Sequence, residues 1–298
     1  IFGVNTSGNL VQGNYIGLNA AGAGAISNTY SGVDIYSGAS GNIIGGEVAG
    51  AGNVISGNGA SGVNLNGAGT ANTLVQGNFI GVTPDGLAAL SNRYSGVGIF
   101  SGAQSNLIGG TVASMRNIIS GNGGDGVALI GAGVNYNRVQ GNFIGLDVTG
   151  TTAIPNTYSG AAVGGSAQSN LIGGGISARN FISGNGSYGV VLSGTNTSAN
   201  QLQGNTIGLD AFHHLSVPNA YAGVAIFGGA LSNQVGGLAL GNGNLIASNL
   251  FGGVQMFDAA TAKNSVRANS IFGNGGNGID LFSGANQSLP APSLTSVA

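Results

Sequence analysis

The tripeptide Asn-x-Ile recurs along the whole chain and organises its hydrophobic and polar positions. Its isoleucines are Ile16, Ile55, Ile80, Ile119, Ile144, Ile182, Ile207, Ile246 and Ile271. The steps between them alternate between 39 (once 38) and 25 residues, which gives a repeat of 64 (once 63). A repeat that fills a chain in this way predicts one elongated domain whose core grows by stacking.

Each half of the repeat contains three short apolar segments, each bounded by Gly, Asn or Ser. In residues 106–136 these segments read NLIGG, NIISG and GVALI. Such runs are too short for helices and rich in β-branched residues, which is typical of strands. Two kinds of half-repeat alternate. Type A has a long loop before its third strand, such as 148–159, and type B has a shorter loop between its first two strands, such as 110–116.

Aligning the half-repeats produces uniform apolar columns. The third strand supplies one column of Val33, Val63, Val97, Val127, Ala161, Val190, Val224, Val254 and Ile279, and another of Ile35, Leu65, Ile99, Leu129, Val163, Leu192, Ile226, Met256 and Leu281. The column between them has no common character, as expected for strands with one buried face. The sequence therefore predicts an all-β fold, a right-handed parallel β-helix of about nine turns with three short strands per turn. At a strand spacing of ~4.8 Å the rod would be roughly 43 Å long.

Asparagine forms two further columns. One precedes the first strand and reads Asn9, Asn42, Thr73, Asn106, Asn137, Asn170, Asn200, Asn233 and Asn264, and the other is the Asn of Asn-x-Ile. An asparagine repeated at one bend can bond its amide to the asparagines above and below it. We expect two asparagine ladders and, beside the second, an isoleucine ladder in the core.

We expect residues 1–287 to form this single domain and residues 288–298, which include Pro290 and Pro292, to form a linker. Because Ile1 already lies inside the repeat pattern, other domains of a longer chain are expected to adjoin it.

Composition removes several classes of function. Glycine contributes 61 of 298 residues, but 42% of residues are hydrophobic and lie at fixed positions, so the glycines indicate turns rather than disorder. The formal net charge is −2 with no basic stripe, which argues against nucleic-acid and anionic-membrane partners. Cysteine is absent, and no apolar run is long enough to span a membrane.

The segments GNFIG-LD, NIISGNGG-GVAL and SNLIGG resemble the parallel β-helix repeat of the pectin-lyase-like superfold. The resemblance extends from about Ile1 to Phe282. It implies the fold but not one function, because this superfold holds pectate lyases, polygalacturonases, uronan epimerases, phage tailspikes, adhesins and noncatalytic carbohydrate-binding modules.

The candidate catalytic groups are few. Asp147 and Asp210 occupy equivalent positions two turns apart, about 10 Å by strand spacing, in a column we align with Asn19, Asn58, Thr83, Asn122, Asn185, Asn249 and Asn274. A turn position that accepts Asn, Asp or Thr explains that column better than a carboxylate pair. His213 and His214 occur in one type A loop only, where a loop insertion is a simpler explanation than a metal or acid–base site.

The motifs of the polygalacturonases and the Asp-Pro-His-Asp motif of the uronan epimerases are missing, and the six cations are scattered. We therefore expect no enzyme activity, no cofactor and no metal.

Aromatic residues supply the better candidates for a site. A tyrosine ends each long type A loop, and these are Tyr30, Tyr94, Tyr158 and Tyr221. They recur every two turns, ~10 Å apart, which is comparable to an extended disaccharide. A second aromatic column lies just past the third strand and includes Tyr36, Phe100, Phe227 and Phe257. Aromatic rings beside amides suit sugars, whereas an alternative is that the tyrosines are buried and fix their loops to the core. A third outward row, which includes Tyr15, Phe79 and Phe143, is so apolar that we expect the loops to cover it.

These residues favour a secreted, noncatalytic module that binds a plant cell-wall polysaccharide, with a xylan-type hemicellulose as the first candidate. The resemblance is closest in character to β-helix carbohydrate-binding modules of bacterial plant-polysaccharide hydrolases, which implies a glycoside hydrolase as a possible neighbouring domain. Two alternatives stay open. One is a structural or adhesin stalk, and the other is a polysaccharide lyase or glycoside hydrolase.

Overall fold

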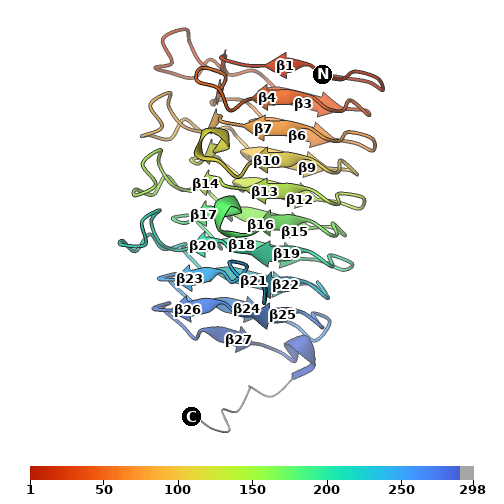
Figure 1. The fold of residues 1–298 in the computed structure, drawn as a ribbon, viewed down its shortest axis with the longest axis vertical. Helices are drawn as coiled ribbons and strands as arrows, with labels where there is room; N and C mark the ends of the chain where they lie inside the picture. The colour runs from red at the N-terminus through yellow and green to blue at the C-terminus, as the bar shows by residue number, and fades with distance from the viewer. Residues whose placement is uncertain (289–298) are drawn as a thin grey trace.

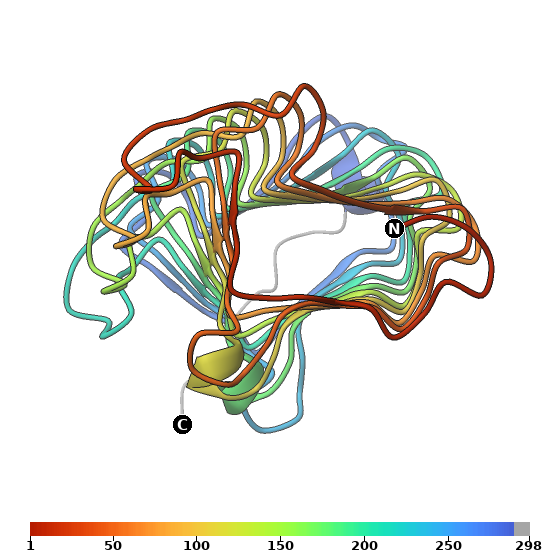
Figure 2. The ribbon, with the colours of Figure 1, turned by 90° about the horizontal axis from the view of Figure 1, so that it is seen from above.

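The computed structural model describes residues 1–288 and confirms the all-β prediction. The strands form three parallel sheets of nine strands each, stacked along one axis (Figure 1). Seen from the N-terminal end, the chain runs clockwise as it recedes from the viewer, so the β-helix is right-handed (Figure 2). The proposed linker begins at the last described residue, and the rest of it lies outside the described part of the chain.

The first sheet contains β1 (Leu10–Val11), β4 (Ile43–Gly45), β7 (Leu74–Gln76), β10 (Leu107–Gly109), β13 (Arg138–Gln140), β16 (Leu171–Gly173), β19 (Gln201–Gln203), β22 (Gln234–Gly236) and β25 (Ser265–Arg267). The second contains β2 (Tyr15–Ile16), β5 (Val54–Ile55), β8 (Phe79–Ile80), β11 (Ile118–Ile119), β14 (Phe143–Ile144), β17 (Phe181–Ile182), β20 (Thr206–Ile207), β23 (Leu245–Ala247) and β26 (Ser270–Phe272). The third contains β3 (Val33–Tyr36), β6 (Val63–Asn66), β9 (Val97–Phe100), β12 (Val127–Ile130), β15 (Ala161–Gly164), β18 (Val190–Ser193), β21 (Val224–Phe227), β24 (Val254–Met256) and β27 (Ile279–Leu281).

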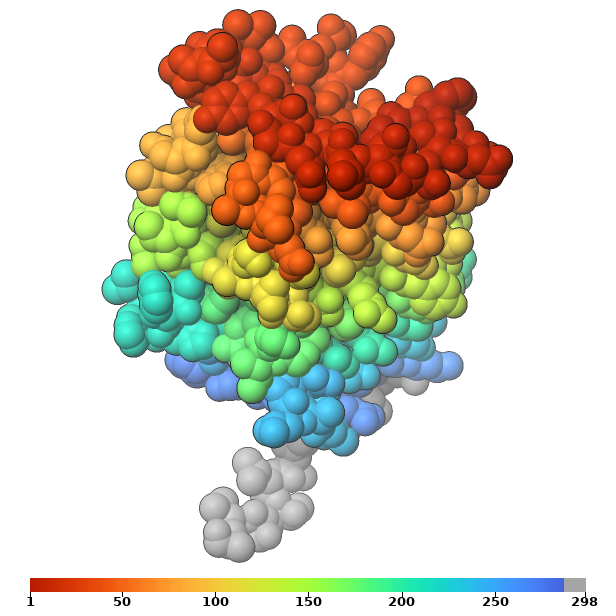
Figure 3. All heavy atoms as spheres, turned by 45° about the horizontal axis from the view of Figure 1, so that its top comes forward, coloured from red at the N-terminus to blue at the C-terminus, as the bar shows by residue number. Residues whose placement is uncertain are grey.

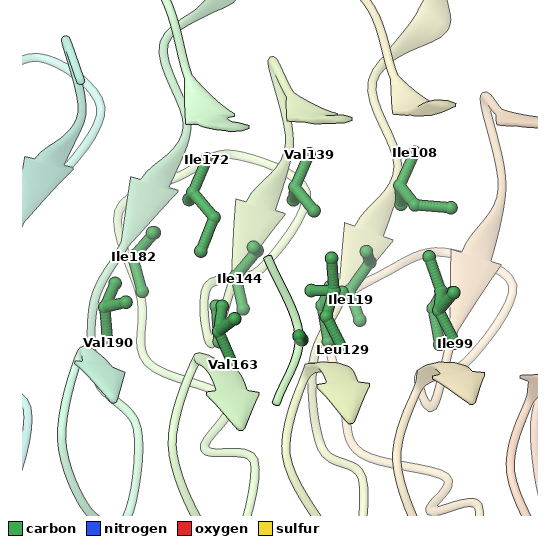
Figure 4. Close-up of a cluster of buried hydrophobic side chains, with 14 of the residues drawn as sticks. Ile99, Ile108, Ile119, Leu129, Val139, Ile144, Val163, Ile172, Ile182 and Val190 are labelled. Atoms are coloured by element: carbon green, nitrogen blue, oxygen red, sulfur yellow. The ribbon is translucent and has the colours of Figure 1, made fainter. Parts of the chain in front are cut away.

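One strand from each sheet makes a rung, and the rungs stack in register. Ile119 pairs with Ile144, and Leu129 pairs with Val163, so like side chains lie above one another. Figure 4 shows these side chains converging on the interior from all three sheets. The predicted core columns are buried except at the end rungs, where Ile16 and Ile271 are half-buried and Ile279 and Leu281 are exposed because no further rung covers them.

The structure contains three asparagine ladders, one more than predicted. The two predicted ladders are present, and in the Asn-x-Ile ladder each side-chain Nδ2 donates to the next Oδ1 at 2.8–3.0 Å. The third ladder consists of Asn28, Asn58, Asn92, Asn122, Asn156, Asn185, Asn219, Asn249 and Asn274. Its type A members lie two residues before the row tyrosines. Our alignment of Asn58 and Asn122 with Asn19 and Asp147 was therefore wrong.

Thr73 interrupts the first ladder. Its backbone N–H donates to Asn106 Oδ1 at 2.9 Å, but its own Oγ1 is buried and has no hydrogen-bond partner among the described residues. The Nδ2 of Asn42, one rung earlier, is left with long contacts of 3.3 and 3.5 Å to backbone carbonyls.

The type A loops cover a second apolar cluster, as predicted for the third outward row. Phe143 and Ile118 on the outer face of the second sheet pack against Leu146, Ile154 and other loop residues. Tyr15, at the N-terminal end of this row, stays exposed. Each type A loop starts with a short antiparallel bridge, for example between Leu146 and Ala153.

The type B loops lie at the corner between the first and second sheets. Two of them contain single 3₁₀ turns, η1 (Ala113–Met115) and η2 (Ile176–Ala178), which Figure 2 shows one above the other. A third 3₁₀ turn, η3 (Ala285–Ser288), follows β27. Within residues 1–288 there is no helix with the length and apolar character needed to cross a membrane.

Candidate functional site

The four predicted tyrosines form a row along the edge where the type A loops meet the third sheet. Backbone hydrogen bonds join the row through the intervening type B residues: Gly124 N donates to Tyr94 O, and Tyr158 N donates to Gly124 O. Tyr30, Tyr94, Tyr158 and Tyr221 are 75%, 54%, 60% and 46% exposed. The alternative in which buried rings fix the loops to the core is therefore wrong for this structure.

The residues between the tyrosines decide how much of each ring is free. Ala60, Gly124 and Ser187 occupy the three intervening positions, and none of them carries a large side chain. The pattern changes beyond Tyr221, where Phe251 occupies the next position and its ring stacks on Tyr221 at 5.5 Å with an interplanar angle of 14°. Tyr188 contacts Tyr221 from the other side at 5.3 Å. Tyr158 thus has no aromatic or cationic neighbour over its ring among the described residues, whereas the Arg93 guanidinium lies over the Tyr94 ring at 5.5 Å and Tyr221 has an aromatic neighbour on each side.

A carboxylate accompanies the two central tyrosines. Asp125 follows Gly124 on the rung between Tyr94 and Tyr158, and its Oδ1 accepts a hydrogen bond from Ser159 N at 2.9 Å. Burial raises the pKa of the Asp125 carboxyl, and the bond from Ser159 partly offsets this effect. Sequence reasoning did not place Asp125 beside the tyrosines, because only the stacking of rungs brings them together.

The second predicted aromatic column lies on the outer face of the third sheet. Phe100 folds back over the sheet, where a Cβ at Gly98 would collide with its ring. Phe257 lies between Phe227 at 6.5 Å and Phe282 at 4.9 Å. Phe100, Phe227 and Phe257 are half-buried, so these rings are partly used to cover the sheet.

Tyr36, on the first strand of the third sheet, borders a cavity. The cavity has a volume of about 320 Å³ and is lined by Tyr36, Asp34, Asn64 and Asn66, among others. Asn64 Nδ2 donates to Asp34 Oδ1 at 2.8 Å. An aromatic ring beside amides and a carboxylate matches the polar and apolar faces of a sugar.

Asp147 and Asp210 cap their own loops. Asp147 Oδ1 accepts from Thr151 N at 3.0 Å and Thr152 N at 3.1 Å, and Asp210 Oδ1 accepts from Leu215 N at 2.8 Å. Both carboxylates are buried. Their hydrogen bonds support the turn interpretation over a carboxylate pair.

His213 lies in the fourth type A loop, within the hairpin closed by the bridge between Leu209 and Ser216. Its Nε2 is 2.9 Å from Thr206 Oγ1 and 3.5 Å from Arg179 Nη1. Burial and the neighbouring Arg179 lower the pKa of His213. His214 is held through its backbone N–H, which donates to Asp210. The part of the chain described by the structure holds no cluster of three or more His, Cys, Asp or Glu side chains able to bind a metal ion.

No protein-family model matches the sequence, and no curated protein matches it. Among solved structures, the chain is similar to the A-module of the mannuronan C-5 epimerase AlgE4 from Azotobacter vinelandii, with a TM-score of 0.51 and 16% sequence identity. The match covers 88% of this chain and 63% of that one, so the chain spans less than two thirds of its structural neighbour. At this identity the likeness concerns the fold alone: the chain is a parallel β-helix with a structural neighbour in the pectin-lyase-like superfold.

Proposed function

We propose that this chain is a noncatalytic module that binds a polysaccharide outside the cell, with a xylan-type hemicellulose as its first candidate ligand. The observation that carries the proposal is the row of exposed tyrosines at intervals of two rungs, ~10 Å. Rings at this interval suit an extended polymer, because successive disaccharides can each contact one ring.

Small residues between the tyrosines support the same function. With Gly124 between them, Tyr94 and Tyr158 keep ring surface open to a ligand, and Asp125 supplies a hydrogen-bond acceptor for sugar hydroxyls. Each contact is weak alone, but a rigid row engages a polymer at several points and gains affinity through multivalency.

The hydrogen bonds of the two buried carboxylates agree with a function in binding rather than in catalysis. Asp147 and Asp210 already accept backbone hydrogen bonds within their loops, and a hydrolase needs two carboxylates free to act on one sugar, about 5–9.5 Å apart. The structural neighbour is a module of a mannuronan C-5 epimerase, but the Asp-Pro-His-Asp motif of the uronan epimerases is missing from this sequence.

Affinity electrophoresis through gels containing soluble plant polysaccharides tests the proposal. We expect wild-type protein to be retarded by xylan, and Tyr94→Ala with Tyr158→Ala to lose most of that retardation. Tyr136→Ala is the matched control, because Tyr136 is similarly exposed but lies outside both aromatic columns.

The other outcomes would change the proposal. If a different neutral polysaccharide retarded the protein and xylan did not, that polysaccharide would replace xylan as the proposed ligand. A complete lack of retardation across the panel would favour the stalk, and release of new sugar ends during incubation would show an enzyme. If Tyr136→Ala weakened binding as much as the paired variant, the tyrosine row would not be the site.

A further inference from the structure

Two arginines depart from the repeat at one position. The residue before the Asn of Asn-x-Ile in the four type B loops is Gly52, Arg116, Arg179 and Gly243 in chain order. Because the fold accepts glycine there in the outer repeats, winding the β-helix does not require arginine. The two central repeats have nevertheless gained a large cationic side chain at equivalent places.

Both arginines line a groove over the outer face of the second sheet. Arg116 and Ala113 border two adjoining cavities of about 300 and 230 Å³. Phe79, Ile118 and Val148 line the first cavity, and Phe181, Arg179 and His213 line the second. The type A and type B loops form two rows of protrusions along this face (Figure 3), and the cavities lie between these rows.

The fold holds each guanidinium in place and leaves part of it free. Arg116 Nε donates to Gly141 O at 3.1 Å, and Arg179 Nε donates to Gly204 O at 3.0 Å. Arg116 also lies over the ring of Phe143 at 4.1 Å. Within residues 1–288, no carboxylate forms an ion pair with either arginine, and the terminal nitrogens of Arg116 have no hydrogen-bond partner there.

Burial without a counter-ion is unfavourable for these cations. It lowers the pKa of both Arg116 and Arg179, because the charged form loses hydration in the groove. An arriving carboxylate would restore the lost interaction with two parallel N–H···O bonds, the geometry that a guanidinium favours.

We propose that this groove binds the carboxylates of an acidic glycan, with one uronate at Arg116 and another at Arg179. Two rungs separate the arginines, ~10 Å, so the carboxylates of alternate sugars along an extended chain can reach both. The aromatic floor at Phe79 and Phe181 offers surface to sugar C–H groups. A nucleic acid fits poorly, because the whole chain carries only six Lys and Arg residues against eight acids. This site does not depend on the tyrosine row, which lies at the other end of the type A loops.

Wild-type protein provides the first test, which needs no variant. We expect gels containing polygalacturonate to retard it, and gels containing the fully methyl-esterified polymer, which lacks the charges, not to do so. Retardation by polygalacturonate should disappear at about 0.5 M NaCl, where the Debye length is only ~4 Å. Equal retardation by both polymers would overturn the proposal, as would retardation by neither. Equal retardation by poly-glutamate would also overturn it, because charge without a sugar would then suffice.

Variants locate the site. Arg116→Gln with Arg179→Gln should weaken polygalacturonate binding about tenfold or more, as expected for two partly exposed charge-assisted contacts. Arg138→Gln with Arg267→Gln changes the net charge equally, but these two arginines are exposed on the first sheet, so binding should persist. Equal losses in both pairs would contradict the assignment to the groove. Arg116→Gln with Arg179→Gln should leave xylan binding unchanged, so a failure of this proposal is distinguishable from a failure of the proposed function on which it does not depend.

Discussion

At the residue scale, an asparagine in a ladder uses every hydrogen-bond donor and acceptor of its side-chain amide. Asn117 Nδ2 donates to Asn142 Oδ1 and to Val75 O, while its own Oδ1 accepts from both the N and the Nδ2 of Asn78. Every donor and acceptor of the buried side chain is thereby satisfied, which avoids the cost of burying unpaired polar atoms. Threonine cannot reproduce this pattern, because its hydroxyl offers one donor and no second N–H.

Thr73→Asn should therefore stabilise the protein. The new amide would accept from Asn42 and donate to Asn106, and each hydrogen bond gained contributes about 0.5–1.5 kcal/mol to the free energy of unfolding. Urea denaturation measures the change. The reciprocal variant Asn137→Thr should destabilise by about 1–3 kcal/mol, since it leaves buried partners unpaired. A stabilising effect of both variants would contradict this account of the ladder.

Asp125 should make stability depend on pH. Because burial raises its folded-state pKa above the unfolded value, the ionised carboxylate destabilises the fold above the folded-state pKa, and this effect vanishes below the unfolded value. Asp125→Asn keeps an acceptor for Ser159 N but removes the charge. Its free energy of unfolding relative to wild type should rise from pH 3.5 to pH 7 in parallel denaturant melts. A difference that stays constant over this range would show that Asp125 has the same pKa in both states.

The strands show, at the scale of elements, where sequence reasoning succeeded. The alternation of Val63, Asn64 and Leu65 predicts one face in the core, and stacking repeats the same choice on neighbouring rungs. The third ladder was missed because four of its nine members follow long loops, where counting residues from the strands loses the register. The signal was present in the Asn that lies two residues before each row tyrosine, as in Asn92 and Tyr94.

The type A loops should open independently of the β-helix. Phe143 is the buried ring on which Leu146 and Ile154 of the loop pack, outside the central core. We therefore expect Phe143→Ala to lower global stability by less than the about 3–5 kcal/mol that such a truncation costs when the loop and the sheet unfold together. Amide exchange should become faster in 146–154 and stay unchanged in β15, as expected for local opening. Hydrogen exchange followed by mass spectrometry distinguishes these results. Unchanged exchange in the loop together with unchanged stability would mean that this cluster does not hold the loop.

The whole molecule carries its candidate sites on the loops and outer faces, while the core is nearly uniform. Sequence spacing located the tyrosine row because it recurs with the repeat. It missed Phe251, which does not recur with the repeat, and the groove of Arg116 and Arg179, because arginine occupies this position in only two of the four type B loops. These residues meet only when segments 25–65 residues apart are wound onto neighbouring rungs, so a linear reading shows them as isolated.

Hydrogen bonds of the ladders join each rung to the one before and the one after, so a pair of rungs is also a unit of length. One more 64-residue repeat would extend the rod by about 10 Å and add one tyrosine while the existing rungs stayed as they are. The long loops thus recur at a fixed interval along the β-helix. Under the proposed function, adding one repeat would tighten binding to a long polymer and leave the affinity for a single disaccharide unchanged.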